Sequence, residues 1–104
     1  MSATDRIVVT IDPDLEDIAP GYLDNRRNEL PKLRQMLAER DFENLKILGH
    51  RMKGSGAGYG FDPITEFGRH IEDGARRGDG ALIQSNIDAL ETYLSRVDII
   101  FGAT

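Results

Sequence analysis

Apolar side chains recur at spacings of three and four residues along four stretches of this chain, and this periodicity constrains the fold more than any other feature. Each stretch is long enough for several helical turns. The stretches span about residues 21–40, 42–58, 62–78 and 80–100. Asp41 stands where the second stretch needs an N-cap, and Asp62-Pro63 gives a cap-plus-proline signal before the third. Four substantial helices with short connections predict an all-α fold, an antiparallel four-helix bundle.

The N-terminal segment does not share this periodicity. Residues 1–11 contain one β-prone run, and no other stretch of the sequence offers it a partner strand. We therefore expect residues 1–11 to form an extended arm lying on the domain. Asp12 and Pro13 give an N-cap and a first-turn proline, which predict a short extra helix that stops at Pro20. Pro31 is expected to kink or divide the helix that follows.

Length and composition narrow the classes of protein. A chain of 104 residues predicts one domain, with the arm followed by a helical bundle over residues 12–104. No cysteine is present, so disulfides and thiolate metal sites are excluded. No apolar run reaches the ~20 residues that span a bilayer, and no signal segment is seen, so we expect a cytoplasmic protein without a membrane partner. The net charge of −5 argues against nucleic-acid binding. Since no helix is apolar all round, we expect a monomer, and the start at Met1 favours a free-standing protein.

A glycine-rich segment follows the only histidine of the second predicted helix, His50. Glycine inside a helix is less favourable than alanine by about 0.8–1 kcal/mol per position. Close approach of a second backbone, to pack or to react, is the usual reason to keep such glycines. The glycines concerned are Gly49, Gly54, Gly56 and Gly58.

The helical neighbours of His50 suggest a reactive surface histidine. Residues three and four positions away share its face, which points away from the apolar stripe of the same helix. These neighbours are Lys46, Ile47, Lys53, Gly54 and Ala57. His50 is therefore expected at the surface, with the cation of Lys53 one turn away and open space above Gly54. A neutral imidazole is a competent nucleophile near pH 7.

The third predicted helix offers a matching polar face. Its members follow one another at spacings of four, three and four: Thr65, Arg69, Glu72 and Arg76. If the two helices are antiparallel neighbours, Glu72 can accept a hydrogen bond from Nδ1–H of His50. This bond would fix the tautomer and leave Nε2 as the free nitrogen. Arg69 or Arg76 could add positive charge at the rim.

These residues resemble a known family. From His50 to Phe61 the chain reads HRMKGSGAGYGF. This segment is similar to the His-x-hydrophobic-Lys-Gly-small-small block of the histidine-containing phosphotransfer (HPt) domains of multistep two-component signalling. Its glycine-rich form also resembles the phosphotransfer domain of chemotaxis kinases. The resemblance extends across the chain, although its specificity lies mainly in residues 45–77.

The resemblance implies a role for each site residue. His50 would accept a phosphoryl group at Nε2, Lys53 would lie near that group, and Gly54 would let the partner approach. Glu72 occupies the position of a Gln or Glu that hydrogen-bonds the histidine, and Arg76 is a weaker match to a supporting basic residue. Gly49 departs from the pattern, because alanine is commoner there; the glycine is expected to loosen the helix.

The resemblance also implies partners. The phosphoryl group would come from, and pass to, aspartates of response-regulator receiver domains, or come from a sensor histidine kinase. Such a domain is a phosphocarrier and not an enzyme in the strict sense. It binds no cofactor of its own, and Mg²⁺ is expected in the receiver. Ile47, Lys46, Ala57 and Arg69 would belong to the docking face around His50 and Gly54.

Three other interpretations compete with this one. A nucleotide-binding loop fails because lysine precedes glycine and no strand comes before it. A metal site is disfavoured because His50 and His70 are the only histidines and no carboxylate lies at i+3 or i+4 from His50. A non-phosphorylated helical adaptor that binds a receiver stays open as the alternative. It leaves the combination of His50, Lys53 and Glu72 without a purpose.

Overall fold

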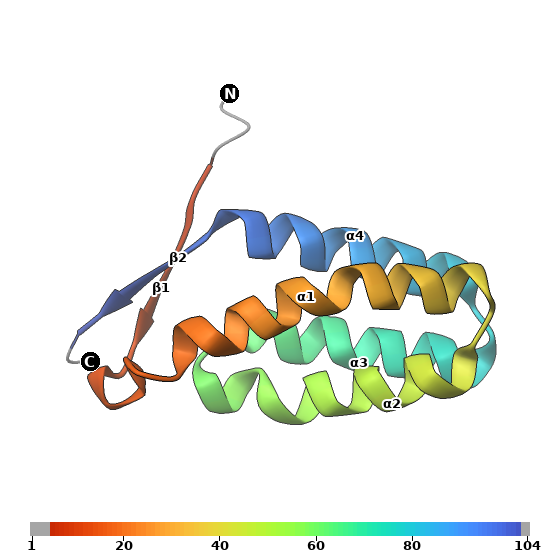
Figure 1. Cartoon of the computed structure of the whole chain (residues 1–104), viewed down its shortest axis with the longest axis horizontal. Helices are drawn as coiled ribbons and strands as arrows, with labels where there is room; N and C mark the ends of the chain where they lie inside the picture. Colours follow the sequence, from red (N-terminus) through yellow and green to blue (C-terminus); the bar gives the residue numbers. More distant parts are fainter. Residues whose placement is uncertain (1–4, 103–104) are drawn as a thin grey trace.

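The computed structural model describes residues 5–102 and contains four α-helices, two 3₁₀ turns and two strands (Figure 1). The elements are β1 (Ile7–Ile11), η1 (Pro13–Leu15), α1 (Ala19–Ala38), α2 (Phe42–Ser55), η2 (Ala57–Tyr59), α3 (Asp62–Arg77), α4 (Gly80–Arg96) and β2 (Val97–Phe101). All four helices that the periodicity predicts are therefore present. The helices lie alongside one another, and the strands extend beyond one end of them (Figure 1).

Side-chain caps and a left-handed glycine fix the helix ends. The carboxylate of Asp41 accepts from the backbone N–H of Asn44 and starts α2, while Asp79 accepts from Leu82 and starts α4. Gly78 ends α3 with a φ of 66°, a conformation that costs a residue with a side chain far more. At the start of α3 the prediction was off by one residue. Phe61 is the cap without a side-chain bond, and Asp62 already lies in the first turn.

The N-terminal prediction needs correction in two places. Asp12 does act as a cap, with its Oδ1 2.9 Å from the backbone N of Asp14, but only one 3₁₀ turn follows it. Pro20 lies in the first turn of α1 and so begins a helix instead of ending one, because the missing N–H is not needed there. Pro31 does not divide α1, which continues unbroken to Ala38. Buried Leu23 and Leu33 anchor the helix on either side of it.

The arm does have a partner strand, contrary to the prediction. β1 pairs in parallel with β2, placing Ile7 opposite Val97 and Ile11 opposite Phe101. Residues 97–101, expected as the last turn of the fourth helix, form this strand. Val97, Ile99 and Phe101 of β2 are half-buried and pack against the core, in which Ile11 is fully buried.

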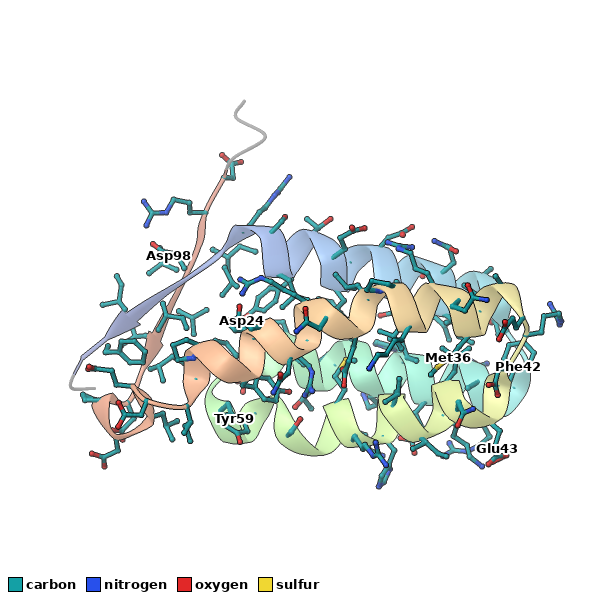
Figure 2. The ribbon with its side chains drawn as sticks, viewed as in Figure 1. Asp24, Met36, Phe42, Glu43, Tyr59 and Asp98 are labelled. Carbon is teal, nitrogen blue, oxygen red and sulfur yellow. The ribbon has the colours of Figure 1, made fainter. Side chains whose placement is uncertain are left out.

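The core combines side chains from every helix and from β1. Its largest fully buried members are Ile11, Leu33, Leu45, Met52, Phe61, Ile64, Ile71, Ile83, Ile87 and Leu90. An aromatic stack seals the end near the sheet, where the ring of Tyr22 lies 4.3 Å from that of Tyr59 and 6.0 Å from that of Phe61. Figure 2 shows Tyr59 at this end of the helices and Phe42 at the opposite end.

Helices α2 and α3 are antiparallel and approach each other closely. Gly49 of α2 lies against Glu72 of α3, while Gly56, the C-cap of α2, lies against the earlier residue Thr65. Between these two points Gly68 faces the backbone of Lys53. This contact brings the polar faces of the two helices together.

Candidate functional site

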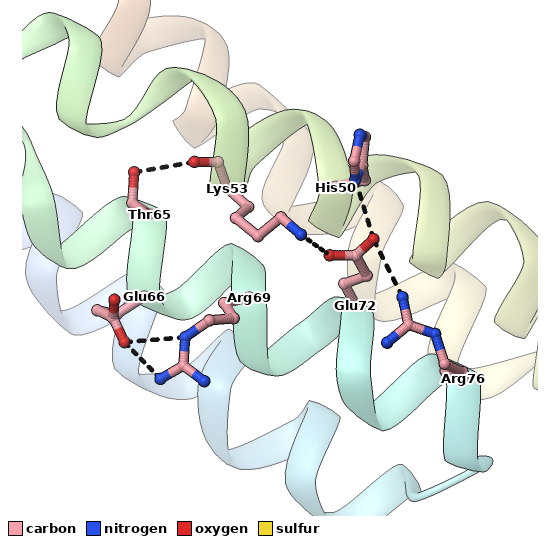
Figure 3. A network of polar contacts seen from close by, with 7 residues as sticks. All are labelled: His50, Lys53, Thr65, Glu66, Arg69, Glu72 and Arg76. Carbon is pink, nitrogen blue, oxygen red and sulfur yellow. Dashed lines mark hydrogen bonds and ion pairs between the residues drawn. The ribbon is translucent and has the colours of Figure 1, made fainter.

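One buried carboxylate gathers three basic side chains where α2 and α3 meet (Figure 3). Glu72 Oε2 lies 2.9 Å from His50 Nδ1 and 3.4 Å from Arg76 Nη2. Its other oxygen, Oε1, lies 2.7 Å from Lys53 Nζ. We call these four residues the Glu72 network. Glu72 is its centre, since every contact within the network passes through that carboxylate.

Burial differs sharply within the Glu72 network. The side chain of Glu72 is 9% exposed, whereas that of His50 is 68% exposed. The amphipathic pattern of α2 explains this, because Leu45 and Met52 on its other face are fully buried. A carboxylate held inside the helix pair therefore orients an imidazole that stands in solvent.

The charge state of Glu72 fixes the tautomer of His50. The pKa of Glu72 is lowered from the ordinary value of 4.5, chiefly by the hydrogen bond from Lys53 and further by the one from His50. Burial acts in the opposite direction and raises it. An ionised carboxylate can only accept hydrogen bonds, so Nδ1 of His50 must carry the proton. In the neutral ring the lone pair is then on Nε2, and the exposed ring presents a nucleophilic nitrogen to solvent.

The basic residues expected around the site separate into two groups. Lys53 and Arg76 contact Glu72, and their side chains are 37% and 61% exposed. Arg69 instead turns along its own helix and donates from Nη2 to Glu66 Oε1 at 2.6 Å (Figure 3). Arg69 therefore lies outside the Glu72 network. It also lies 3.4 Å from Nε2 of His70, which is half-buried.

The face around His50 is open. A Cβ built at Gly54 would meet nothing within 4 Å, and Ala57 beyond it is exposed. Ile47 is 39% exposed, an apolar side chain on a polar face. Lys46 is half-buried and lies 3.9 Å from Glu43. The ring of His50 can therefore be approached over a small, nearly flat surface.

Sequence reasoning placed Thr65 on the polar face of α3 without foreseeing its contact with α2, and it missed Gly68. The hydroxyl of Thr65 donates to the backbone carbonyl of Lys53 at 3.1 Å (Figure 3), and Gly68 faces the backbone of α2. Gly49 was expected to allow close approach of a second backbone and also to loosen its helix. The close approach is confirmed, because a Cβ there would lie 2.7 Å from the backbone N of Glu72, and α2 runs unbroken through this position. The available signal was the cost of an interior helix glycine, which applies equally to Gly68.

Neither a metal cluster nor a membrane-crossing helix occurs in the described part of the chain. Within residues 5–102, no three His, Cys, Asp or Glu side chains are grouped so that they could hold a metal ion. Over the same range, no helix combines the length and apolarity needed to cross a bilayer.

Comparison with known proteins gives one match. A family model described as the Hpt domain matches residues 20–99, a segment that holds nearly all of α1 and the whole of α2, α3 and α4. The four residues of the Glu72 network lie inside it. Neither the curated proteins nor the solved structures gave a match.

Proposed function

Because the chain belongs to the Hpt domain family, we propose that it is a phosphocarrier in which His50 accepts and donates the phosphoryl group. Hpt domains carry out histidine phosphotransfer in two-component signalling, where they interact with receiver domains and histidine kinases. They are carriers rather than enzymes. One observation supports the assignment to His50 above all: the exposed ring has Nδ1 held 2.9 Å from the buried Glu72 carboxylate.

In the proposed transfer the nucleophile is the lone pair of His50 Nε2. It attacks the phosphorus of an aspartyl phosphate on the receiver, a bond forms between Nε2 and phosphorus, and the bond between phosphorus and the aspartate oxygen breaks. The aspartate leaves as a carboxylate. The phosphorylated ring retains its proton on Nδ1 and is therefore cationic, and the anionic Glu72 stabilises that charge. Attack by a second receiver aspartate reverses every step.

Lys53 and Arg76 are proposed to support the phosphoryl group. The ammonium of Lys53 is one helical turn from His50 and already lies 2.7 Å from Glu72, so a small movement would bring it to a phosphoryl oxygen. Arg76 is more exposed and its contact is longer, at 3.4 Å, so we give it the lesser role. Both cations would offset the charge that the phosphoryl group brings to the site.

The receiver would supply the remaining chemistry. We propose that residues of the receiver bind the Mg²⁺ that the reaction requires. We also propose that the receiver docks on the surface around His50, which is formed by Lys46, Ile47, Gly54, Ala57 and Arg69. A single domain folded as an antiparallel four-helix bundle presents this surface over α2 and the neighbouring part of α3. A weak and transient contact suits a carrier that must release each partner.

The test is transfer of labelled phosphoryl from phosphorylated receiver domains with Mg²⁺ to the wild type and to His50→Gln. We expect label on the wild type that is stable in alkali and lost in acid, and none on His50→Gln. His70→Gln is the matched control, since it removes the only other histidine of the sequence and should retain the label.

Two results would overturn the proposal. Label that survives in His50→Gln and disappears in His70→Gln would move the reactive nitrogen to α3. Absence of label with every receiver tested, while receivers still bind, would identify the chain as a helical adaptor.

A further inference from the structure

Gly68 permits a direct contact between the backbones of α3 and α2, beside the Glu72 network. A Cβ built on it would lie 2.5 Å from the backbone N of Lys53 and 2.7 Å from the backbone O of Gly49. Real Cβ atoms do not approach other atoms this closely, so any side chain here would force the helices apart. The two atoms that would be struck belong to the residues on either side of the segment 50–52. Gly68 therefore governs the distance of the His50 backbone from α3.

That distance decides whether His50 reaches Glu72. Glu72 follows Gly68 by one helical turn and lies on the same face of α3. The hydrogen bond between His50 Nδ1 and Glu72 Oε2 measures 2.9 Å. Lengthening it by about 1 Å, the separation a methyl group at Gly68 would demand, takes it beyond hydrogen-bond range.

Thr65 holds the end of α2 in a second way. Its hydroxyl donates to the carbonyl of Lys53 at 3.1 Å and accepts from the backbone N of Ala57 at 2.8 Å. In a continuing helix the N–H of Ala57 would donate directly to the carbonyl of Lys53, so the hydroxyl is inserted into that helical bond. Gly56 makes room for it, because a Cβ there would lie 2.6 Å from the backbone N of Thr65.

We propose that Gly68 and Thr65 are positioning residues: they hold the backbone of α2 against α3 and so place His50 and Lys53 at bonding distance from Glu72. Neither residue touches the phosphoryl group. The inference rests on the proposed function for its consequence in phosphotransfer, but its geometric content concerns the hydrogen bonds of Glu72 alone.

The first test compares two alanine substitutions in α3. Gly68→Ala strikes the backbone of α2, whereas Gly74→Ala faces α4, where its Cβ would lie 2.8 Å from Cγ1 of Ile83. Both substitutions disturb packing, so loss of stability does not distinguish them. The distinguishing readout is ¹⁵N NMR of the His50 ring in the neutral form.

We expect the wild type and Gly74→Ala to show the tautomer with the proton on Nδ1. Gly68→Ala should shift the ring toward protonation on Nε2 and slow phosphoryl transfer by about tenfold, the lower end of the range for loss of a residue that orients a histidine. Retention of the Nδ1–H tautomer in Gly68→Ala, with a transfer rate equal to that of Gly74→Ala, would overturn the role of Gly68.

If Gly68→Ala unfolds, it can be made in a Gly21→Ala background. A Cβ at Gly21 meets nothing within 4 Å, so alanine there strengthens α1 without touching the site. If the double variant Gly21→Ala/Gly68→Ala also fails to fold, the Thr65 substitutions described next test the positioning of His50 and Lys53.

The second test exchanges the Thr65 hydroxyl for a methyl group of the same size. In Thr65→Val both backbone bonds are lost, whereas Thr65→Ser retains them. We expect the carboxyl ¹³C titration of Glu72 to show a higher pKa in Thr65→Val, because Lys53 is no longer held close, and transfer to fall several-fold. Thr65→Ser should restore both. Equal behaviour of the valine and serine variants would overturn the proposal.

These readouts separate two kinds of failure. If the wild type takes no phosphoryl group, the proposed function fails, yet the tautomer and the Glu72 titration still test the positioning. If the wild type is labelled on His50 and the two NMR readouts do not move, the function stands and the positioning fails.

Discussion

Helix α3 packs against α2 through backbone and against α4 through side chains. On the α2 side, Gly68 and Gly49 remove the side chains that would separate the helices, and polar groups of Thr65 and Glu72 fill the contact. On the α4 side, Phe67 meets Tyr93 edge-on with ring centres 5.9 Å apart. Even Gly74 on that side faces the side chain of Ile83.

The difference separates two ways of using a buried polar group. The side chain of Glu72 is 9% exposed, and its carboxylate is paired with three basic side chains. Tyr93 is 4% exposed, and its hydroxyl has no hydrogen-bond partner among residues 5–102. The contact with α2 holds a paired charge at some cost in helix propensity, while the contact with α4 is mainly apolar and leaves one hydroxyl without a hydrogen bond.

The largest effect is expected on the α4 side. Ile83→Ala removes a fully buried side chain and should lower the free energy of unfolding by about 2–5 kcal/mol, measured by urea denaturation. Ile100→Ala, at a side chain that is 51% exposed, should change it by less than about 0.5 kcal/mol. The Nδ1–H tautomer of His50 should persist in folded Ile83→Ala. A shifted tautomer there would mean that the two faces of α3 are coupled.

On the α2 side, Glu72→Gln should cost less stability, about 1–2 kcal/mol at pH 7, because its basic partners reach solvent. The loss of stability in Glu72→Gln should depend on pH.

Folding lowers the pKa of Glu72 below 4.5. The contribution of the carboxylate to the free energy of unfolding is therefore present above about pH 4.5 and disappears as the pH falls through the folded pKa. The unfolding free energies of variant and wild type should therefore converge in acid. Glu66→Gln is the control. The hydrogen bond from Arg69 lowers the pKa of Glu66 as well, but this pair is exposed and screened by solvent, so its convergence should be much smaller. A gap that stays constant with pH would contradict the assigned charge of Glu72.

Tyr93→Phe should raise the unfolding free energy by about 1 kcal/mol, because it removes a buried hydroxyl without a partner. Burial raises the pKa of Tyr93 to about 12, with a further contribution from Asp62, so the wild type should lose stability as pH rises from 10 toward 12. The variant should lack that part of the loss. Tyr22→Phe should instead lower the unfolding free energy, because the hydroxyl of Tyr22 is hydrogen-bonded to Ser55 Oγ at 2.7 Å. Destabilisation by both substitutions would show that Tyr93 has found a partner in solution.

The smallest effect is expected at the edge of the Glu72 network. Arg76→Ala should change stability by less than about 0.5 kcal/mol, because its contact is long and its side chain is 61% exposed. Arg77→Ala breaks a comparable exposed pair with Asp73 and should match it. Phosphoryl transfer distinguishes them: only Arg76→Ala should slow it. Equal transfer rates would remove Arg76 from the phosphoryl site and leave it as a cation at the helix end.

Periodicity revealed the helices because their buried faces repeat every three or four residues, but it misled at the last strand. Leu94, Val97 and Phe101 continue the helical spacing of α4, yet Val97, Ile99 and Phe101 also alternate as a strand. The choice depended on a partner, β1, at the other end of the chain. Local sequence carries no record of such a pairing.

In the site, too, one part could be predicted from the sequence and another could not. The pairing of His50 with Glu72 follows from helix faces and from the family resemblance, because both residues lie on polar stripes that the sequence displays. The backbone contact at Gly68, which brings His50 within reach of Glu72, could not be predicted from the sequence. The face on which Gly68 meets α2 depends on how the two helices cross. Phe61 is fully buried too, yet no helical period marks it, because its burial comes from the turn that ends at Gly60.

The parallel pairing of β1 and β2 has a mechanical consequence. Because the strands run in the same direction, the amino end of β1 lies beside Val97 and the carboxyl end of β2 lies beside Ile11. Tension applied between those two ends pulls the strands lengthwise past each other. Every hydrogen bond of the ladder then bears load at once, whereas a hairpin pulled from its open end would unzip one bond at a time. The two-stranded sheet is therefore loaded in shear and resists a force applied between these two strand ends before that force reaches the helices.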